Sequence, residues 1–370
     1  MGRKDVRTLE EFDRLVNSNK ASDNRWNHRM KNKQLREMSE NDARNYFVKF
    51  EEEEKALADK IILASTWDIN CGIATYTKYL LDSLNSIAPS SFAINPINDE
   101  KLKYNNGGRL THLQHEFGIV PKPPKIRSKL IITWHTVSGH TDMAIEEYES
   151  KYNVVAHIVH SEHMRHSIDS SKDIWTMPHG SMLIPEMKKE DARRLLGINI
   201  DMPIGFVFGF QSGDKNYWRL IDAARNTGIH LIISGSPRNV ASSVYIPNDR
   251  NVTFINRFIT ENEVNLYALA SDILLFDYAP KDHYSVSGAM HSIIGAGRPV
   301  LCSDVKHFSD VEHGYDCLKF EDQHGLEKYI ILALEKSEQF GLAARDYAER
   351  TNWEKIARRH IDIYRMYTNI

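Results

Sequence analysis

From residue 60 onward the sequence alternates short apolar runs with amphipathic stretches, and this alternation begins a second time near residue 204. Continuous apolar runs are typical of strands buried on both faces of a sheet, and amphipathic stretches of helical period are typical of the helices that cover such a sheet. The pattern therefore predicts an α/β chain with two tandem, doubly wound domains, each built on a parallel sheet.

The expected elements fall into two groups. In the first half, we expect strands at residues 61–64, 92–94, 110–113, 130–133, 154–159 and 174–177, and helices at 73–84, 142–152 and 162–170. In the second half, we expect strands at 204–208, 231–233, 252–255, 273–276 and 300–302, and helices at 217–225, 260–270, 288–295 and 353–367. The helix from Thr260 begins with a capping box that Glu263 completes.

These elements divide the chain into four parts: residues 1–56, 57–185, 186–350 and 351–370. The first part is polar and charged, and it ends in a run of four glutamates at 51–54. It is read as a helical extension, either solvated or serving as a docking arm, and the first interpretation is preferred because charge runs are usually solvated faces. The two middle parts are the α/β domains, and the last is a closing helix.

Composition limits the class of protein. The 370 residues suffice for two domains, and 26% charged residues with a formal net charge of −3 indicate a globular protein without an overall polyanion-binding surface. The three cysteines have no metal-ligand spacing and are read as reduced thiols. The sequence has neither the long apolar run of a membrane span nor an apparent signal peptide, so a cytoplasmic location is expected, with peripheral membrane contact left open.

Several segments at the ends of expected strands have residues suited to ligand binding. Gly72 and Ile73 begin a helix directly after the first strand, where backbone N–H groups can approach an anion, although the segment is not GxGxxG and also fits a tight turn. His115, Glu116 and His135 follow two later strands. A histidine in such a chain is more often a surface or core residue, and no HExxH spacing supports a metal site.

Two further segments lie in the second domain. Lys215 follows a glycine-containing loop after the first strand and is suited to neutralising a phosphate, although an isolated lysine is usually only exposed. Ser287, Gly288 and Ala289 precede or begin a helix, where hydroxyl and N–H groups suit a diphosphate, or where Ser287 is simply an N-cap.

Taken together, the order and spacing of these motifs resemble those of the family-4 retaining glycosyltransferases. The segments that carry the resemblance are 65–68 with 71–76, 114–118, 135–137, 159–161, 178–180, 288–300 and 353–357. The resemblance covers roughly residues 60–367. It implies the GT-B fold, in which two Rossmann-like domains face an interdomain cleft and the closing helix crosses back to the first domain.

The resemblance also implies roles for individual residues. Lys215 would pair with the diphosphate of a nucleotide-sugar donor, and Ser287 with the N–H groups of Gly288 and Ala289 would hold the same group. The remaining roles implied are donor contacts from Gly72 and Ile73, sugar positioning by His135, base binding by Arg257 and Phe258, and acceptor-side contacts from His115 and Glu116. The implied reaction moves a hexose from a UDP- or GDP-sugar to a glycan, lipid-linked or other hydroxyl acceptor, with retention and without metal or cofactor.

Departures from the family pattern leave alternatives open. The slots of two common glutamates hold Tyr284 and Ser292, and Phe210 stands where an arginine is common. A non-catalytic, glycosyltransferase-like binding subunit is one alternative. A viral enzyme that glycosylates hydroxymethylated DNA bases, with the basic residues of 25–36 on phosphates, is another. A different sugar enzyme, such as an epimerase or phosphorylase, ranks last.

Overall fold

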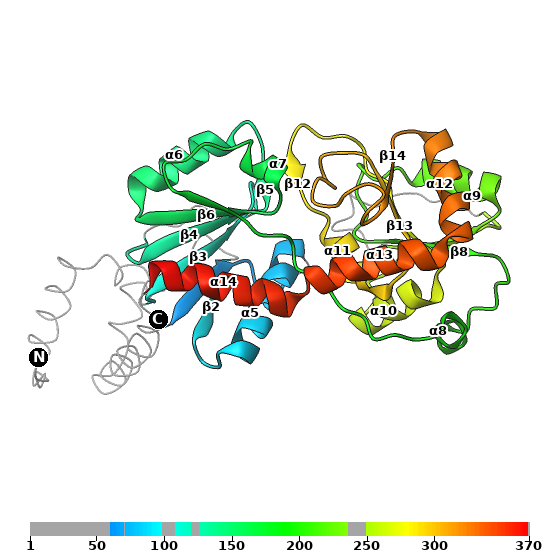
Figure 1. Ribbon diagram of the computed structural model, residues 1–370, viewed down its shortest axis with the longest axis horizontal. Coiled ribbons are helices and arrows are strands. Elements are labelled where there is room, and N and C mark those ends of the chain that lie inside the picture. Colours follow the sequence, from blue (N-terminus) through cyan, green and yellow to red (C-terminus); the bar gives the residue numbers. More distant parts are fainter. Residues whose placement is uncertain (1–59, 70, 98–107, 120–125, 236–248, 369–370) are drawn as a thin grey trace, which may run out of the picture.

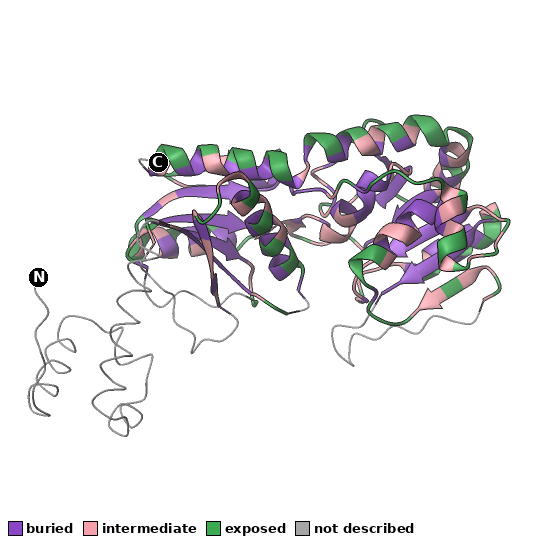
Figure 2. Ribbon diagram, turned by 90° about the horizontal axis from the view of Figure 1, so that it is seen from below, coloured by how far each residue is buried: buried purple, intermediate pink, exposed green. Residues whose placement is uncertain are grey.

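A computed structural model describes residues 60–69, 71–97, 108–119, 126–235 and 249–368 of the chain. Over these residues the chain forms two parallel six-stranded sheets, each covered by helices (Figure 1). The predicted extension, residues 1–56, lies outside the described residues. Figure 2 shows the strands as the most buried parts of both domains, as expected for sheets covered on two faces.

The first sheet has the strand order β2-β1-β3-β4-β6-β7. Its strands are β1 (Ile61–Ser65), β2 (Phe92–Pro96), β3 (Leu110–His115), β4 (Lys129–Trp134), β6 (Val154–Val159) and β7 (Asp173–Thr176). The helices associated with it are α5 (Gly72–Ile87), α6 (Thr141–Lys151) and α7 (Glu162–Arg165). Every residue of β1 and β3 is buried: β1 contains the apolar run predicted at 61–64, whereas β3 also buries the polar side chains of Thr111, His112, Gln114 and His115.

The second sheet has the order β10-β9-β8-β11-β13-β14. Its strands are β8 (Ile204–Phe208), β9 (His230–Ser234), β10 (Val252–Ile255), β11 (Ile273–Phe276), β13 (Val300–Ser303) and β14 (Leu318–Phe320). The helices of this half are α8 (Lys189–Leu196), α9 (Tyr217–Thr227), α10 (Glu261–Ala270), α11 (Gly288–Ile293), α12 (Gln323–Glu335) and α13 (Ser337–Arg350). The predicted capping box of Thr260 and Glu263 is present at the start of α10.

The strand orders place the switch points of the two sheets. The chain leaves β1 toward β2 on one side and returns on the other side as β3, and the second sheet does the same between β8 and β11. In open parallel sheets, the crevice at the carboxyl ends of two such strands is where ligands bind. The topology therefore directs attention to the segments that follow β1, β3, β8 and β11.

The last helix, α14 (Trp353–Tyr367), has the bounds predicted from sequence and packs against the first domain. Trp353 and Ile356 belong to the same core cluster as Ile61 and Leu80. Figure 1 shows α13 and α14 as successive helices, one on each domain. The closing helix thus connects the second domain back to the first.

A two-stranded antiparallel sheet also joins the domains. It pairs β5 (Thr136–Val137) of the first domain with β12 (Tyr284–Ser285) of the second. Beside it, the Tyr284 ring stacks on His163, with centroids 6.0 Å apart, and Ser161 Oγ lies 3.2 Å from Ser309 Oγ. This strap runs along one side of the interdomain face (Figure 1).

The structure corrects several sequence-based expectations. The helix expected at 162–170 ends at Arg165. The Ser167 N–H donates to Met164 O, three residues back, and its hydroxyl donates to His163 O, so the α-helical hydrogen-bond pattern does not continue. The helix expected at 288–295 ends at Ile293 and continues as a short 3-10 helix, Ile294–Ala296. Helices α8, α12 and α13, strand β14 and the two strands of the strap were not predicted from the sequence.

Candidate functional site

Three residues of the second domain meet at the start of α11. Gly209, the first residue after β8, has φ +122°, and a Cβ built on it would lie 2.7 Å from Lys215 Nζ and 3.0 Å from Ala289 Cβ. The backbone angle favours a glycine at 209, because other residues rarely adopt a positive φ of this size. The Lys215 ammonium also lies 5.5 Å from the centre of the Tyr278 ring. The structure thus brings the predicted Lys215 and Ala289 side by side.

Ser287 is the N-cap of α11. Its Oγ accepts a hydrogen bond from Met290 N (3.3 Å) and lies 3.1 Å from Tyr278 Oη. Tyr278 follows β11 and pairs with Lys215 in an isolated bridge, so the segments after β8 and β11 meet as the topology requires. The N-cap interpretation of Ser287 is confirmed, and its predicted contact with a diphosphate stays a prediction.

The first domain contributes the start of α5. Gly72 is its first residue, and a Cβ on Gly72 would meet no atom within 4 Å. The N-cap residue, Cys71, makes no side-chain cap hydrogen bond, and the first turn has no acidic residue. The side chain of Ile73 is buried, so only its backbone can reach a ligand. An anion at this helix end would meet backbone N–H groups and the positive end of the helix dipole.

His135 is buried directly after β4, with protein groups at both ring nitrogens. Its Nε2 lies 3.0 Å from Gln114 Oε1 and its Nδ1 lies 3.1 Å from His160 Nε2. His160 Nδ1 faces Met177 O at 3.0 Å, and because a carbonyl oxygen only accepts, that nitrogen of His160 bears the proton. Burial, followed by the neighbouring His160, holds the pKa of His135 well below 6.5. The predicted role of His135 in sugar positioning stays a prediction.

The two residues predicted on the acceptor side lie at the end of β3 in the first domain. The His115 ring packs against Trp134 (4.4 Å between centroids) and against Phe117 (4.9 Å), inside the first domain. The Glu116 carboxylate accepts a hydrogen bond from Thr136 Oγ1 (2.9 Å), which belongs to the strap. Their acceptor-side role stays a prediction.

The segment predicted to hold the base follows β10. The Arg257 guanidinium pairs with Glu263 (2.5 Å) at the start of α10, and the Phe258 side chain is 61% exposed. An exposed ring on a loop is available to stack on a planar base. Nearby, Asn256 Oδ1 accepts a hydrogen bond from Gln211 Nε2 (2.7 Å), which ties this loop to the Lys215 loop.

The residues in the two glutamate slots have structural roles. Tyr284 lies in the strap, and Lys306 Nζ lies 5.0 Å from the centre of its ring. Ser292 donates its hydroxyl proton to Gly288 O (2.8 Å) within α11. Neither side chain supplies a carboxylate that could accept hydrogen bonds from the ribose hydroxyls of a nucleotide.

His179 was not selected as a site residue from the sequence. A Cβ built on Gly288 would have only one neighbour within 4 Å, which is His179 Nε2 at 3.7 Å. The ring also contacts Tyr76 of α5, with centroids 5.0 Å apart. His179 therefore lies between the starts of α5 and α11. In the sequence, His179 belongs to the segment 178–180, but its position in the site depends on Gly288, which is more than 100 positions away.

The buried histidines of this region predict that stability falls with acid. Burial lowers the pKa of His160 to about 4, whereas the unfolded chain binds that proton below about pH 6.5. Between these values the unfolded state binds more protons, so the stability that neutral His160 contributes is present above pH 6.5 and is lost as pH falls toward 4. We expect the free energy of unfolding to drop by about 2 kcal/mol from His160 alone between pH 7.5 and 5.

Urea unfolding at several pH values measures this effect. Burial lowers the pKa of His112, His135 and His179 in the same direction, so the total loss should exceed that of one group. A His160→Gln variant should show a shallower dependence than the parent. An equal dependence in both proteins would contradict the assignment to His160.

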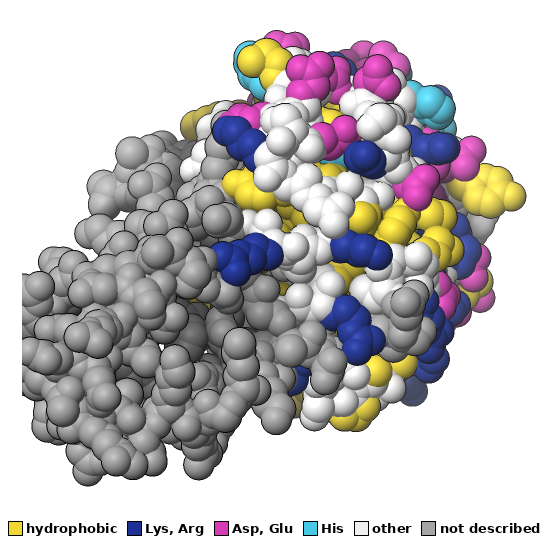
Figure 3. Space-filling view, turned by 90° about the vertical axis from the view of Figure 1, so that its left-hand side faces the viewer, with side chains coloured by type: hydrophobic (Ala, Val, Ile, Leu, Met, Phe, Trp, Pro, Cys, Tyr) yellow, Lys and Arg dark blue, Asp and Glu magenta, His cyan; other side chains and the backbone are white. Residues whose placement is uncertain are grey.

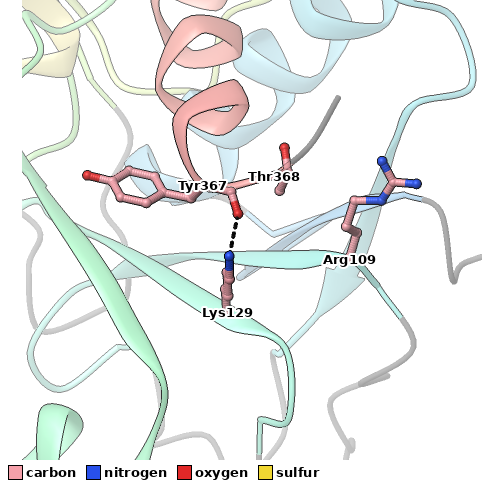
Figure 4. A pocket seen from close by; sticks show the side chains of 4 residues that line it. All are labelled: Arg109, Lys129, Tyr367 and Thr368. Carbon is pink, nitrogen blue, oxygen red and sulfur yellow. Dashed lines mark hydrogen bonds between the residues drawn. The ribbon is translucent and has the colours of Figure 1, made fainter.

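A separate pocket of about 400 Å³ lies at the amino ends of β3 and β4, opposite to the candidate site. It is lined by Arg109, Lys129, Tyr367 and Thr368, and Lys129 Nζ donates to Tyr367 O at 2.9 Å (Figure 4). Figure 3, which views this end of the molecule, shows Lys and Arg side chains spread over its middle. This pocket is not part of the interdomain site.

Solved structures resemble the whole described fold. Sucrose-phosphate synthase from Thermosynechococcus elongatus has a TM-score of 0.62 at 16% identity, covering 84% of this chain and 99% of that chain. HepE from Anabaena, solved in complex with UDP and glucose, has a TM-score of 0.59 at 12% identity, with 83% and 99% covered. A glycosyltransferase from Rickettsia africae has a TM-score of 0.61 at 11% identity, with 83% and 98% covered.

These likenesses and the two facing sheets define the class of fold: the chain has the GT-B fold that its motifs predicted. No protein-family model matches the sequence, and no curated protein matches it. Within the described part of the chain, no helix is both long and apolar enough to cross a membrane. The same residues contain no group of three or more His, Cys, Asp or Glu side chains placed to hold a metal ion.

Proposed function

We propose that the protein is a glycosyltransferase that moves a hexose from a UDP- or GDP-sugar to a hydroxyl acceptor, such as a glycan or a lipid-linked sugar. One observation carries the proposal. The Lys215 ammonium is packed beside Ala289 in the first turn of α11, and His179, which is 3.7 Å from the Cβ position of Gly288, also contacts Tyr76 near the start of α5. A cation and two helix starts form a site for a diphosphate. HepE, which has this fold, was solved with UDP-glucose.

The proposed mechanism uses these groups to stabilise the departing nucleoside diphosphate. Charge builds up on the diphosphate as the glycosidic bond breaks, and Lys215 with the N–H groups of Gly288 and Ala289 would offset it without reorganisation. The start of α5, at Gly72 and Ile73, would contact the donor from the first domain. Phe258 would stack on the base, and retention with the acceptor attacking from the leaving-group face is the proposed course. We propose that neither metal nor cofactor takes part.

A ligand panel tests this proposal. The protein is titrated with UDP, GDP and their glucose and mannose derivatives, and thermal unfolding and slow donor hydrolysis are followed, the latter by mass spectrometry. We expect one nucleotide series to stabilise the folded state by about 3 kcal/mol at 100 times its dissociation constant, because only the folded state binds. Hydrolysis of the matching sugar donor should accompany this stabilisation.

The same panel separates the alternatives. Binding of a nucleotide without hydrolysis of any donor would favour the non-catalytic binding subunit, which the side chains of Tyr284 and Ser292 motivate. Absence of any response from folded protein would contradict the glycosyltransferase. Hydrolysis that is stimulated by DNA with hydroxymethylated bases would favour the DNA-modifying enzyme.

A further inference from the structure

The segment after β7 fixes the ring of His179 in one orientation and one tautomer. His179 Nδ1 lies 2.8 Å from Gly180 O, and a carbonyl oxygen only accepts, so Nδ1 bears the proton. Gly180 itself has no room for a side chain, because a Cβ there would overlap the Trp353 ring. The close contact between this backbone and α14 therefore sets where the imidazole lies.

Aromatic neighbours restrain the ring on several sides. It stacks on His291, with centroids 4.5 Å apart and planes at 21°, and it forms T-shaped pairs with Tyr76 (5.0 Å between centroids) and Trp353 (5.7 Å). His291 is in turn held by Asp310 Oδ2 at 2.7 Å. A ring restrained in this way loses little conformational freedom when a ligand binds, which favours selective contacts.

The other nitrogen, Nε2, is directed at the start of α11. It lies 3.7 Å from the Cβ position of Gly288 and has no hydrogen-bond partner among the residues that the structure describes. His179 is only 8% exposed, and its Nε2 is not among the fully buried side-chain atoms that lack a partner, so this edge of the ring keeps contact with solvent. Nε2 is therefore an acceptor, open at the place where the proposed donor binds.

The chemistry of an acceptor decides what it can bind there. Phosphate oxygens of the donor are themselves acceptors and repel the Nε2 lone pair, whereas a sugar hydroxyl donates a proton to it. Burial, with His291 and His160 nearby, keeps the pKa of His179 well below 6.5, so the ring is neutral near pH 7. The histidine thus favours contact with the sugar and not with the diphosphate.

We propose that His179 determines sugar specificity by accepting, through Nε2, a hydrogen bond from one hydroxyl of the transferred sugar. This proposal rests on the proposed glycosyltransferase function and deepens it. Two residues at the start of α11 then have different roles: Lys215 binds the diphosphate, and His179 binds a hydroxyl of the sugar attached to it.

Binding of UDP and UDP-glucose, measured by calorimetry, is the first test, with GDP and GDP-mannose as the second pair of probes. In His179→Phe, which keeps a flat ring and removes the acceptor, we expect affinity for the bound nucleotide sugar to fall about tenfold. Affinity for the bare nucleoside diphosphate should stay within about twofold. His179→Gln, which retains an acceptor, should recover part of the loss, and the exposed His140→Phe should change neither affinity.

Monodeoxy analogues of the sugar donor identify the hydroxyl. One analogue should bind the parent protein about tenfold more weakly than the full donor, yet bind His179→Phe with no further loss. Equal weakening of nucleotide and nucleotide sugar in His179→Phe, or no weakening, would overturn the role of His179 while leaving the glycosyltransferase intact. Absence of nucleotide binding by the parent protein would overturn both.

Discussion

Lys215→Ala is expected to lose about 100-fold to 1000-fold in donor turnover, because it removes a preorganised cation from the developing charge of the leaving group. The fold should tolerate the change. The ammonium is only partly buried, and its hydrogen bond to Phe208 O is long, at 3.5 Å. Rates of donor hydrolysis and of transfer, taken with thermal unfolding of the same samples, measure the two effects separately.

A lysine outside the site provides the matched control. Lys328 is exposed on α12, and Lys328→Ala should leave both turnover and stability unchanged. Binding of the bare nucleoside diphosphate should weaken in Lys215→Ala as well, because the charge acts on the diphosphate. Turnover equal to that of the parent protein would remove Lys215 from the mechanism.

Gly295→Ala is expected to destabilise the protein by about 3 kcal/mol, near the upper end for overpacking a core. A Cβ at this position would overlap the carbonyl group of Met182, and backbone atoms cannot rotate away as a flexible side chain can. The contact is fixed from a second side, because Arg345 donates to the carbonyl oxygens of both Gly295 and Ile184 at 2.6 Å. The strain would therefore fall on the segment that joins the two domains.

Urea unfolding followed by circular dichroism measures this loss. Gly139 is the matched control, since a Cβ there would meet no atom within 4 Å, and Gly139→Ala should change stability by less than about 0.5 kcal/mol. A loss below 1 kcal/mol in Gly295→Ala would mean that the joining segment moves aside easily.

The class of fold could be predicted from local sequence patterns. Apolar runs such as 61–64 and 204–208 predicted buried parallel strands, and the helix of residues 353–367 was predicted with its observed bounds. The capping box at Thr260 was also predicted correctly. These features follow from neighbours within a few positions, because periodicity, capping and turn preferences depend on local backbone geometry.

The side-chain surroundings of the candidate site were decided by tertiary structure. The sequence placed His115 and His135 at strand ends, but only packing showed that one ring joins an aromatic cluster and that the other is held between Gln114 and His160. His179 became a candidate site residue only because its Nε2 lies near Gly288, which is far from it in the sequence. Periodicity predicts which residues are buried, because it depends on local backbone geometry. Which polar atoms between the two domains lack a protein partner and can bind a ligand depends on how the domains pack together.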